Sequence, residues 1–342
     1  MSLLASYHFD AGIIPASFIL NTLSPFAIST TVSRTGSRSF RITGNAIDIS
    51  WFALLLLPVA QSEFYFQGAF YIPYVPSSGS KILSWLASDG TVLGGISLNA
   101  SPKIDFYTGD FAVKVGTSNT TFATSTWFVL ELHINISDSG TIDCCVNALP
   151  DITIPCDTKP GTQTTISQLR FANICYSSAA AYIYWDDIVI NDTTGIINNS
   201  WPNCARVYYL PLTGDGATKQ WDVYPAGLTH YTAIDDIPPS PTDYLRATTT
   251  DLVDVFSCTD LPATAGSIKA VIPEVYAFKA SVETPSSLGI GIDIGEGVEF
   301  SDDILLSVIQ DNHSKIWEQK PGGGNFSTVD VNALQLYLKS RP

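Results

Sequence analysis

The residues with the most direct capacity for chemistry are the carboxylates, which could act in pairs on a glycosidic bond. Such a pair needs a separation of about 5–9.5 Å, which alternate positions on one strand provide. Glu131, however, is followed at its alternate positions by His133 and Asn135. Asp293 is followed in the same way by Gly295, and the pattern Glu-x-Asp-x-x-Glu occurs nowhere. We therefore expect no catalytic residues and no enzyme activity.

Asp186 and Asp187 form the most conspicuous acidic pair, and carboxylate oxygens are ligands for a hard cation such as calcium. Neighbouring residues on a strand point to opposite faces, so these two could share one ion only at a β-bulge. We favour a structural role, in which one of them accepts hydrogen bonds from loop amides near the first strand. The pairs at 235–236 and 302–303 are interpreted as turn residues that cap backbone groups. The sequence thus predicts no metal site and no cofactor.

Histidine and glycine motifs indicate no further site. The histidines are far apart and lack the serine or cysteine context of a hydrolase. We expect them to be scattered surface residues: His8, His133, His230 and His313. The glycines of residues 289–295 lack the spacing of a phosphate loop, and residues 214–219 lack the full P-loop pattern. Nucleotide binding is therefore not expected.

Charge and hydropathy exclude two kinds of partner. The chain has 32 acidic and 17 basic residues, which leaves 15 excess negative charges that would repel nucleic-acid phosphates. The longest apolar stretch, residues 51–60, is interrupted by Pro58 and is about half as long as the ~20 residues of a membrane span. Residues 1–10 also lack the basic start and apolar run of a secretory signal. We expect neither nucleic-acid binding nor membrane insertion.

Aromatic residues leave one binding role open. Tyr71 and Tyr74 flank Pro73 and Pro76, a pattern that is typical of an exposed loop, and rings on such loops can stack on sugars. Aromatic side chains fill protein cores and subunit contacts equally well. The sequence therefore allows sugar binding but leaves the ligand-binding residues unknown.

The cysteines lack the short repeated spacings of a zinc site or of a small disulfide-bonded domain. There are six: Cys144, Cys145, Cys156, Cys175, Cys204 and Cys258. We interpret them as mostly free, buried thiols. A disulfide from one of the two adjacent cysteines to Cys156 stays open as an alternative.

The elements that must position these residues are strands, because apolar residues alternate with polar ones along most of the chain. The clearest runs are residues 130–136, 183–190, 289–295 and 334–338. Helical spacing is nearly absent, and the best candidate is a short helix over 328–334 with Thr328 as its N-cap. The sequence predicts an all-β protein of two β-sandwich, jelly-roll-like domains.

The length of 342 residues favours two domains over one. A stretch rich in Asn, Asp, Thr, Gly, Ser and Pro follows the aromatic strand near residue 190, and such a composition is typical of a linker. We predict a first domain over 1–192, a linker over 193–206 and a second domain over 207–342.

The order of elements between residues 127 and 190 resembles the end of a concanavalin A-like or laminin-G-like jelly roll. A strand, a Ser-Asp-Ser-Gly turn and a hairpin are followed by Gln-Leu-Arg-Phe at 168–171 and by Tyr-Ile-Tyr-Trp-Asp-Asp-Ile-Val-Ile at 182–190. In such domains the Asp-Asp strand returns beside the first strand, here expected at residues 6–10.

The later segments resemble virion structural proteins of tailed bacteriophages and prophages. The resemblance rests on the order of several motifs: Asp-Asp-Ile-Val-Ile-Asn-Asp-Thr-Thr-Gly at 186–195, Asp-Asp-Ile-Pro-Pro at 235–239, Leu-Pro-Ala-Thr-Ala-Gly-Ser-Ile-Lys-Ala at 261–270 and Phe-Ser-Thr-Val-Asp-Val-Asn-Ala-Leu-Gln at 326–335. It covers the chain from about residue 127 onward. The segment Trp-Pro-Asn-Cys-Ala-Arg at 201–206 departs from the family, which has a Gly-Asp pair there.

The resemblance implies a non-enzymatic component of a bacteriophage virion, made in the host bacterial cytoplasm and exposed on the particle exterior as a tail protein, head fibre or capsid decoration. Its expected partners are other virion proteins and further copies of itself, with a trimer as one candidate. Low charge density and abundant apolar residues suit such permanent interfaces. A glycan-binding host-attachment adhesin and a polysaccharide depolymerase stay open as alternatives.

Overall fold

The chain forms two compact units, residues Met1–Val207 and Tyr208–Pro342, in a computed structural model. The structure describes the whole chain except residues 1, 13, 16, 21–25, 45–51, 76–78, 176–181 and 281–284. Residues 193–206, predicted as a linker, lie within the first unit. They do so because backbone groups of this segment bond to side chains of the first unit's sheet, including those of Gln67 and Glu131.

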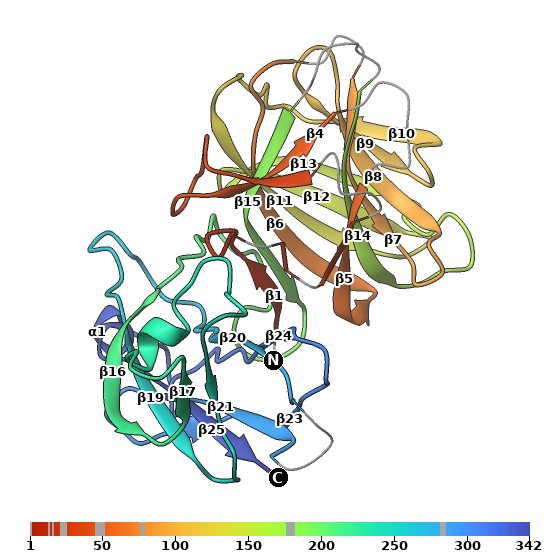
Figure 1. Cartoon of the computed structure of the whole chain (residues 1–342). Coiled ribbons are helices and arrows are strands. Elements are labelled where there is room, and N and C mark those ends of the chain that lie inside the picture. The colour runs from red at the N-terminus through yellow and green to blue at the C-terminus, as the bar shows by residue number, and fades with distance from the viewer. Residues whose placement is uncertain are drawn as a thin grey trace. The chain divides into compact units, whose positions relative to one another are not determined.

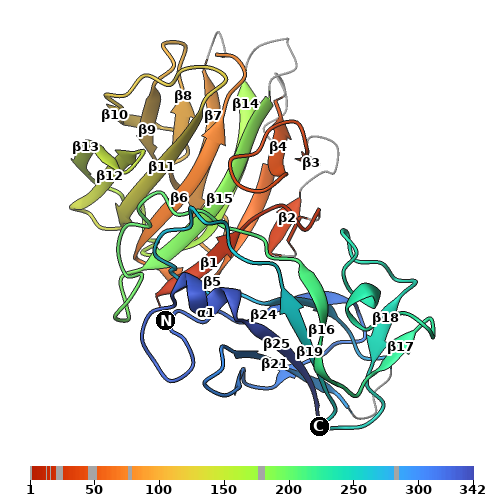
Figure 2. The ribbon, with the colours of Figure 1, turned by 90° about the vertical axis from the view of Figure 1, so that its left-hand side faces the viewer.

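The first unit consists of two antiparallel sheets (Figures 1 and 2). The eight-stranded sheet has the order β13 (Leu149–Cys156), β12 (Gly140–Val146), β11 (Trp127–Asn135), β6 (Glu63–Tyr71), β15 (Tyr182–Asp192), β4 (Ser39–Thr43) and β3 (Phe26–Ser29), and β1 (Leu3–Tyr7) also pairs with β15. The seven-stranded sheet has the order β10 (Val113–Thr117), β9 (Ile104–Thr108), β8 (Val92–Leu98), β7 (Ser80–Leu86), β14 (Ile166–Cys175), β5 (Phe52–Gln61) and β2 (Phe18–Leu20).

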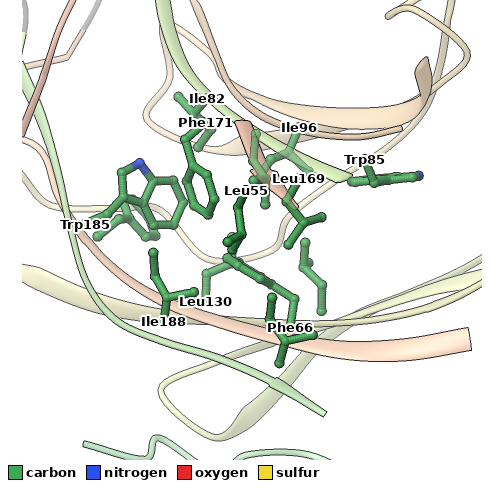
Figure 3. Packing of buried hydrophobic residues seen from close by; sticks show 14 of the residues in the cluster. Leu55, Phe66, Ile82, Trp85, Ile96, Leu130, Leu169, Phe171, Trp185 and Ile188 are labelled. Carbon is green, nitrogen blue, oxygen red and sulfur yellow. The ribbon is translucent and has the colours of Figure 1, made fainter. Parts of the chain in front are cut away.

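The core of the first unit lies between these sheets, and large aromatic side chains dominate it. Figure 3 shows Trp185, Phe171 and Leu55 close together, with side chains such as Phe66 and Leu130 around them. The rings of Phe171 and Trp185 meet edge to face, with centroids 5.3 Å apart. Edge-to-face contacts between aromatic rings stabilise a core by more than the burial of their apolar surface alone would.

Alternation decides which residues stay outside the core, as the sequence predicts. In β11, Leu130 and Leu132 belong to the core cluster, so Glu131 and His133 lie on the opposite, outer face of the eight-stranded sheet. The all-β fold is confirmed. β15 pairs with β1 in antiparallel register, with Tyr7 opposite Ile188, which confirms the return of the Asp-Asp strand beside the first strand. The first strand spans Leu3–Tyr7, however, and not the predicted residues 6–10.

The second unit is also built from antiparallel strands. Its six-stranded sheet has the order β16 (Leu212–Lys219), β19 (Val253–Cys258), β25 (Gln335–Arg341), β21 (Ser287–Asp293) and β22 (Glu299–Phe300), and β23 (Ile304–Leu305) pairs with β21. Two small sheets add β17 (Asp222–Tyr224) with β18 (Tyr244–Arg246), and β20 (Glu274–Ala277) with β24 (Asp311–Ser314). A short 3-10 helix, η1, spans Tyr231–Ala233. The core of this unit contains Phe256, Ile290 and Trp317.

A short helix, α1 (Thr328–Asn332), is close to the predicted one, but Ser327 rather than Thr328 is its N-cap. Ser327 Oγ accepts a hydrogen bond from the Asp330 amide at 3.2 Å, and Asp330 Oδ2 accepts one from the Ser327 amide at 2.7 Å. This capping box satisfies two amides that the first helical turn leaves free. Thr328 is not the cap because Asp330, three residues after Ser327, closes the box from that position.

We expect Ser327→Ala to lower the free energy of unfolding of the second unit by about 1 kcal/mol, because it removes the capping oxygen. Ser327→Thr keeps a hydroxyl at the same place and is expected to retain most of that stability. Chemical denaturation of the full chain, with hydrogen exchange of peptides from 320–335, measures both variants. Equal losses in the two variants would contradict a capping role.

The described cysteines other than residue 175, whose side chain the structure does not describe, are free thiols. Cys144 is buried and the others are partly exposed. Cys156 lies opposite Gly140 in the hairpin register, away from Cys144 and Cys145, so the alternative disulfide does not form. In the part of the chain that is described, no helix has the length and apolar character needed to cross a bilayer.

Candidate functional site

The outer face of the eight-stranded sheet carries polar and aromatic side chains that do not belong to the core. Strands β11, β6 and β15 are neighbours in this sheet (Figure 2). Their outward residues therefore form rows across it. Three rows are relevant here: Trp127–Tyr71–Tyr184, Glu131–Gln67–Val189 and His133–Tyr65–Asn191.

The first of these rows is aromatic. Trp127 begins β11, Tyr71 ends β6 and Tyr184 lies near the start of β15, so antiparallel pairing brings all three to one end of the sheet. Tyr182 adds a fourth ring on the same face of β15, and we call these four residues the aromatic row. The sequence did not reveal it, because the row depends on register between distant segments. Period-two spacing of Tyr182 and Tyr184 was the one local signal.

The rings of the aromatic row contact one another in sequence. The Tyr71 centroid lies 5.5 Å from that of Trp127 and 5.7 Å from that of Tyr184. Tyr182 and Tyr184 are 6.4 Å apart. Tyr184 is buried, whereas the other three are half-buried and retain accessible ring surface. The row therefore presents apolar ring area to solvent on a rigid support.

Tyr71 was expected in an exposed proline-flanked loop together with Tyr74. The structure places Tyr71 in β6 instead, since the strand continues to this residue and pairs with Trp127. Tyr74 lies in the loop that follows, and Pro76 lies outside the described residues.

His133 is the centre of a second cluster, at the other end of the same face. Its Nδ1 lies 2.9 Å from Asp143 Oδ2 and its Nε2 lies 2.8 Å from Glu63 Oε1. The imidazole stacks on Tyr65, with centroids 4.5 Å apart, and Trp201 meets both rings edge to face. Burial, together with the Glu63 and Asp143 charges, raises the pKa of the Tyr65 phenol. Both imidazole nitrogens are thus engaged by carboxylates, and the Tyr65 phenol keeps its proton.

The prediction that the histidines are scattered surface residues is therefore wrong for His133, whose side chain is only 16% exposed. It is also wrong for His230 in the second unit. The His230 side chain is 15% exposed, and its Nδ1 lies 2.5 Å from Oδ2 of Asp254, which is fully buried. His133 lies on a strand that alternation reveals, whereas His230 lies in the turn before η1. In both cases the sequence does not reveal the carboxylates that the fold brings alongside.

A segment that we call the strap, residues 199–207, crosses the middle of this face. Glu131 Oε1 accepts hydrogen bonds from the amides of Asn203 at 2.6 Å and Cys204 at 3.4 Å. Gln67 accepts one from the Ala205 amide at 2.8 Å and donates one to the Ala205 carbonyl at 2.9 Å. Burial raises the pKa of the Glu131 carboxyl group, while the two amides and a nearby arginine oppose the rise. Glu131 is thus occupied by a structural contact.

Asp186 and Asp187 anchor two loops. Asp187 has a φ of 47° and sits where the register of β15 against β6 shifts, which is the bulge that a shared ion would have required. Asp187 Oδ2 accepts from Arg34 Nη1 at 2.5 Å and from Thr35 Oγ1 at 2.8 Å, and its Oδ1 accepts from the Val207 amide at 2.8 Å. No metal needs to be invoked to satisfy these oxygens.

Asp186 accepts hydrogen bonds from loop amides near the predicted first strand, as expected: the loop follows β3, and its Ser37 amide donates to Asp10 Oδ1 at 2.6 Å. Asp186 Oδ2 accepts from the amides of Arg34 at 2.8 Å and Thr35 at 3.1 Å. Burial and the Asp187 charge raise the pKa of Asp186 to about 7. Across the described residues, no group of three or more His, Cys, Asp and Glu side chains is arranged to hold a metal ion. Of the other acidic pairs, Asp303 forms an ion pair with Arg341 at 3.4 Å.

Comparison with known proteins gives structural likenesses only. No family model matches the chain, and no curated protein matches it. Among solved structures, the cellulose-induced protein Cip1 has a TM-score of 0.47 at 15% identity, covering 59% of this chain and all of its own. An endo-β-1,4-glucuronan lyase from the fungus Trichoderma reesei has a TM-score of 0.39 at 9% identity, and the match covers 49% of this chain and 87% of the lyase chain. A mutant of the alginate lyase Aly36B in complex with an alginate trisaccharide has a TM-score of 0.41 at 13% identity, and the match covers 55% of this chain and 97% of the lyase chain.

These findings contradict the function predicted from the sequence. The structures that resemble the chain belong to carbohydrate-related proteins, and none of the three is a virion component. The virion role, drawn from the order of short motifs, is therefore corrected, whereas the expected lack of enzyme activity stays a prediction. Self-association, partners and location stay predictions that the structure does not test.

Proposed function

We propose that the first unit binds carbohydrate on the outer face of its eight-stranded sheet, through the aromatic row. One observation carries the proposal: Trp127, Tyr71 and Tyr184 pair in register on three adjacent strands, and their rings are in contact. Aromatic rings offer flat apolar area against which the C–H faces of a sugar can pack, while their polar edges remain hydrated. Three strands span about 10 Å, so the row fits an oligosaccharide better than a single sugar.

We further propose that binding occurs without bond cleavage. The aromatic row contains no carboxylate and no histidine. His133 lies at the other end of the same face, with both ring nitrogens engaged by Glu63 and Asp143, so it is not placed to exchange a proton with a ligand on the aromatic row. Incubation of the chain with soluble polysaccharides is expected to release no new reducing or unsaturated ends.

The test of binding uses Tyr71→Ala and Trp127→Ala in the full chain. Affinity electrophoresis in gels containing hydroxyethyl cellulose, xylan, glucuronan or alginate is expected to show retardation in at least one gel. Each substitution should weaken that binding about tenfold to thirtyfold, since truncating a central Trp or Tyr removes about 1.5–2 kcal/mol.

A matched control is Tyr107→Ala. Tyr107 is also half-buried and contacts another ring, Phe111 at 5.3 Å, but it lies on β9 of the seven-stranded sheet. This variant should bind as the unaltered chain does. Absence of retardation in every gel, or an equal loss in the control, would refute carbohydrate binding at this face.

A further inference from the structure

Arg41 extends the aromatic row onto a fourth strand. It lies on β4 between the core residues Phe40 and Ile42, so its side chain emerges on the outer face. In the register of the sheet it is opposite Tyr184. Its guanidinium carbon is 5.1 Å from the centroid of the Tyr182 ring. A fixed positive charge therefore adjoins the proposed sugar-binding surface.

The guanidinium of Arg41 has no acidic partner in the described part of the chain. Its Nε is buried and has no hydrogen-bond acceptor among the described residues. Two other arginines of this unit differ: Arg34 bonds to Asp187 and to the strap, and Arg206 donates to the Arg34 carbonyl. What distinguishes Arg41 from the remaining arginines is its place beside the aromatic row.

Stacking on Tyr182 orients the guanidinium beside the aromatic row. A ligand carboxylate that pairs with a guanidinium lacking an acidic partner forms a charge-assisted hydrogen bond. The planar fork of arginine fits a carboxylate through two parallel hydrogen bonds. No aspartate or glutamate belongs to the aromatic row, and Asp186, two residues beyond Tyr184, has its carboxyl group engaged by the Arg34 and Thr35 amides.

We infer that the carbohydrate bound at this face is acidic, and that Arg41 binds the carboxylate of a uronic acid unit whose ring packs on the aromatic row. This inference rests on the proposed carbohydrate-binding function and specifies its ligand. The net charge of −15 repels polyanions in general, so recognition depends on this local contact and not on bulk attraction.

The experiment compares oligosaccharides that differ only in the acidic group. Three matched pairs are titrated calorimetrically into the full chain: β-1,4-glucuronate and cellulose oligomers, galacturonate and galactose oligomers, and mannuronate and mannose oligomers of equal length. In at least one pair the acidic member should bind at least about tenfold more tightly, since a hydrogen bond to a charged group contributes about 1.5–3 kcal/mol. Arg41→Gln should remove this preference and leave binding of the neutral member within about twofold.

The matched control is Arg170→Gln. Arg170 also stacks on a ring, with its guanidinium carbon 4.6 Å from the Phe52 centroid, and its Nε likewise lacks a partner among the described residues, but it lies on β14 of the other sheet. It should keep the preference for the acidic member. Arg41→Lys keeps the charge without the planar fork and should lose most of the preference.

The outcomes separate this inference from the proposal on which it rests. If both members of every pair bind equally and Arg41→Gln changes neither, the carboxylate contact is refuted while carbohydrate binding stands. If no oligomer binds and Trp127→Ala has no effect in the gels, the proposed function fails. Preferential binding of a sulfated cellulose oligomer over all three uronates would refute the assignment to a carboxylate.

Discussion

Asp187→Ala is expected to destabilise the first unit by about 3–5 kcal/mol, because it leaves a buried positive charge without its partner. The Asp187 side chain is fully buried and that of Arg34 is 10% exposed. The substitution also removes the acceptor for the Val207 amide at the end of the strap. Alanine further resists the φ of 47° at this position. For a unit of this size we expect the midpoint of thermal unfolding to fall by about 10 °C.

Differential scanning calorimetry of the full chain measures this effect, and hydrogen exchange in peptides from 30–38 and 199–207 assigns it to the two loops. The control is Asp138→Ala, which breaks an exposed ion pair with Lys159, in which the Asp138 side chain is 77% exposed. Asp138→Ala should lower the free energy of unfolding of the first unit by less than about 1 kcal/mol. Equal effects of the two substitutions would show that Asp187 does not anchor the loops.

The stability of the first unit is expected to fall as the pH rises from about 4 to about 7. Burial raises the pKa of Asp186 from its ordinary value of 3.8 to about 7. Below about pH 4 the group is protonated in both states. Between these values the unfolded chain has released the proton that the folded chain retains, so a higher pH favours unfolding. Above about pH 7 this fall in the free energy of unfolding is complete. It amounts to a few kcal/mol, on the order of 1.4 kcal/mol for each unit by which the folded and unfolded pKa values of Asp186 differ.

Asp186→Asn should reduce this slope, because asparagine cannot ionise and still offers an oxygen to the Arg34 and Thr35 amides. Burial also raises the pKa of the Asp187 carboxyl group, which contributes the remainder of the slope. Denaturant unfolding of the full chain at pH 5 and pH 8, with hydrogen exchange in first-unit peptides, compares the variant with the unaltered chain. Asp110→Asn, at an exposed residue of the same unit, is the control for removing one charge and should keep the slope. A pH profile that is the same with and without Asp186 would contradict the prediction.

The sequence allowed the strands and their faces to be predicted because alternation is a local property. Leu130 and Leu132 alternate with Glu131 and His133, and the structure buries the first pair in the core. The pairing of the Asp-Asp strand with the first strand was predicted from the resemblance to concanavalin A-like jelly rolls and not from alternation. It failed at Ser327, where the cap depends on a side chain three residues away.

The candidate site could not be predicted because it depends on register between segments far apart in the chain. Tyr71 and Tyr184 are separated by more than a hundred positions and meet only through the pairing of β6 with β15. The bulge at Asp187 shifts that register by a residue, which no local pattern reveals. The virion function was wrong for a related reason: an ordered set of short motifs reports shared loops and turns, while activity resides in side chains grouped across strands.

The contacts that hold the strap to Gln67, Glu131 and Asp187 use its main chain, and this has a consequence for how those strap positions can vary among species. These contacts use the amides and carbonyls of residues 203–207. Any residue type can supply such groups, provided that the left-handed φ values of Asn203 and Cys204 are tolerated. Related proteins should therefore vary at the strap positions whose main chain makes these contacts, and should keep the three sheet residues that bind them. Those three positions, rather than the loop itself, provide the signature by which distant members of this lineage could be traced.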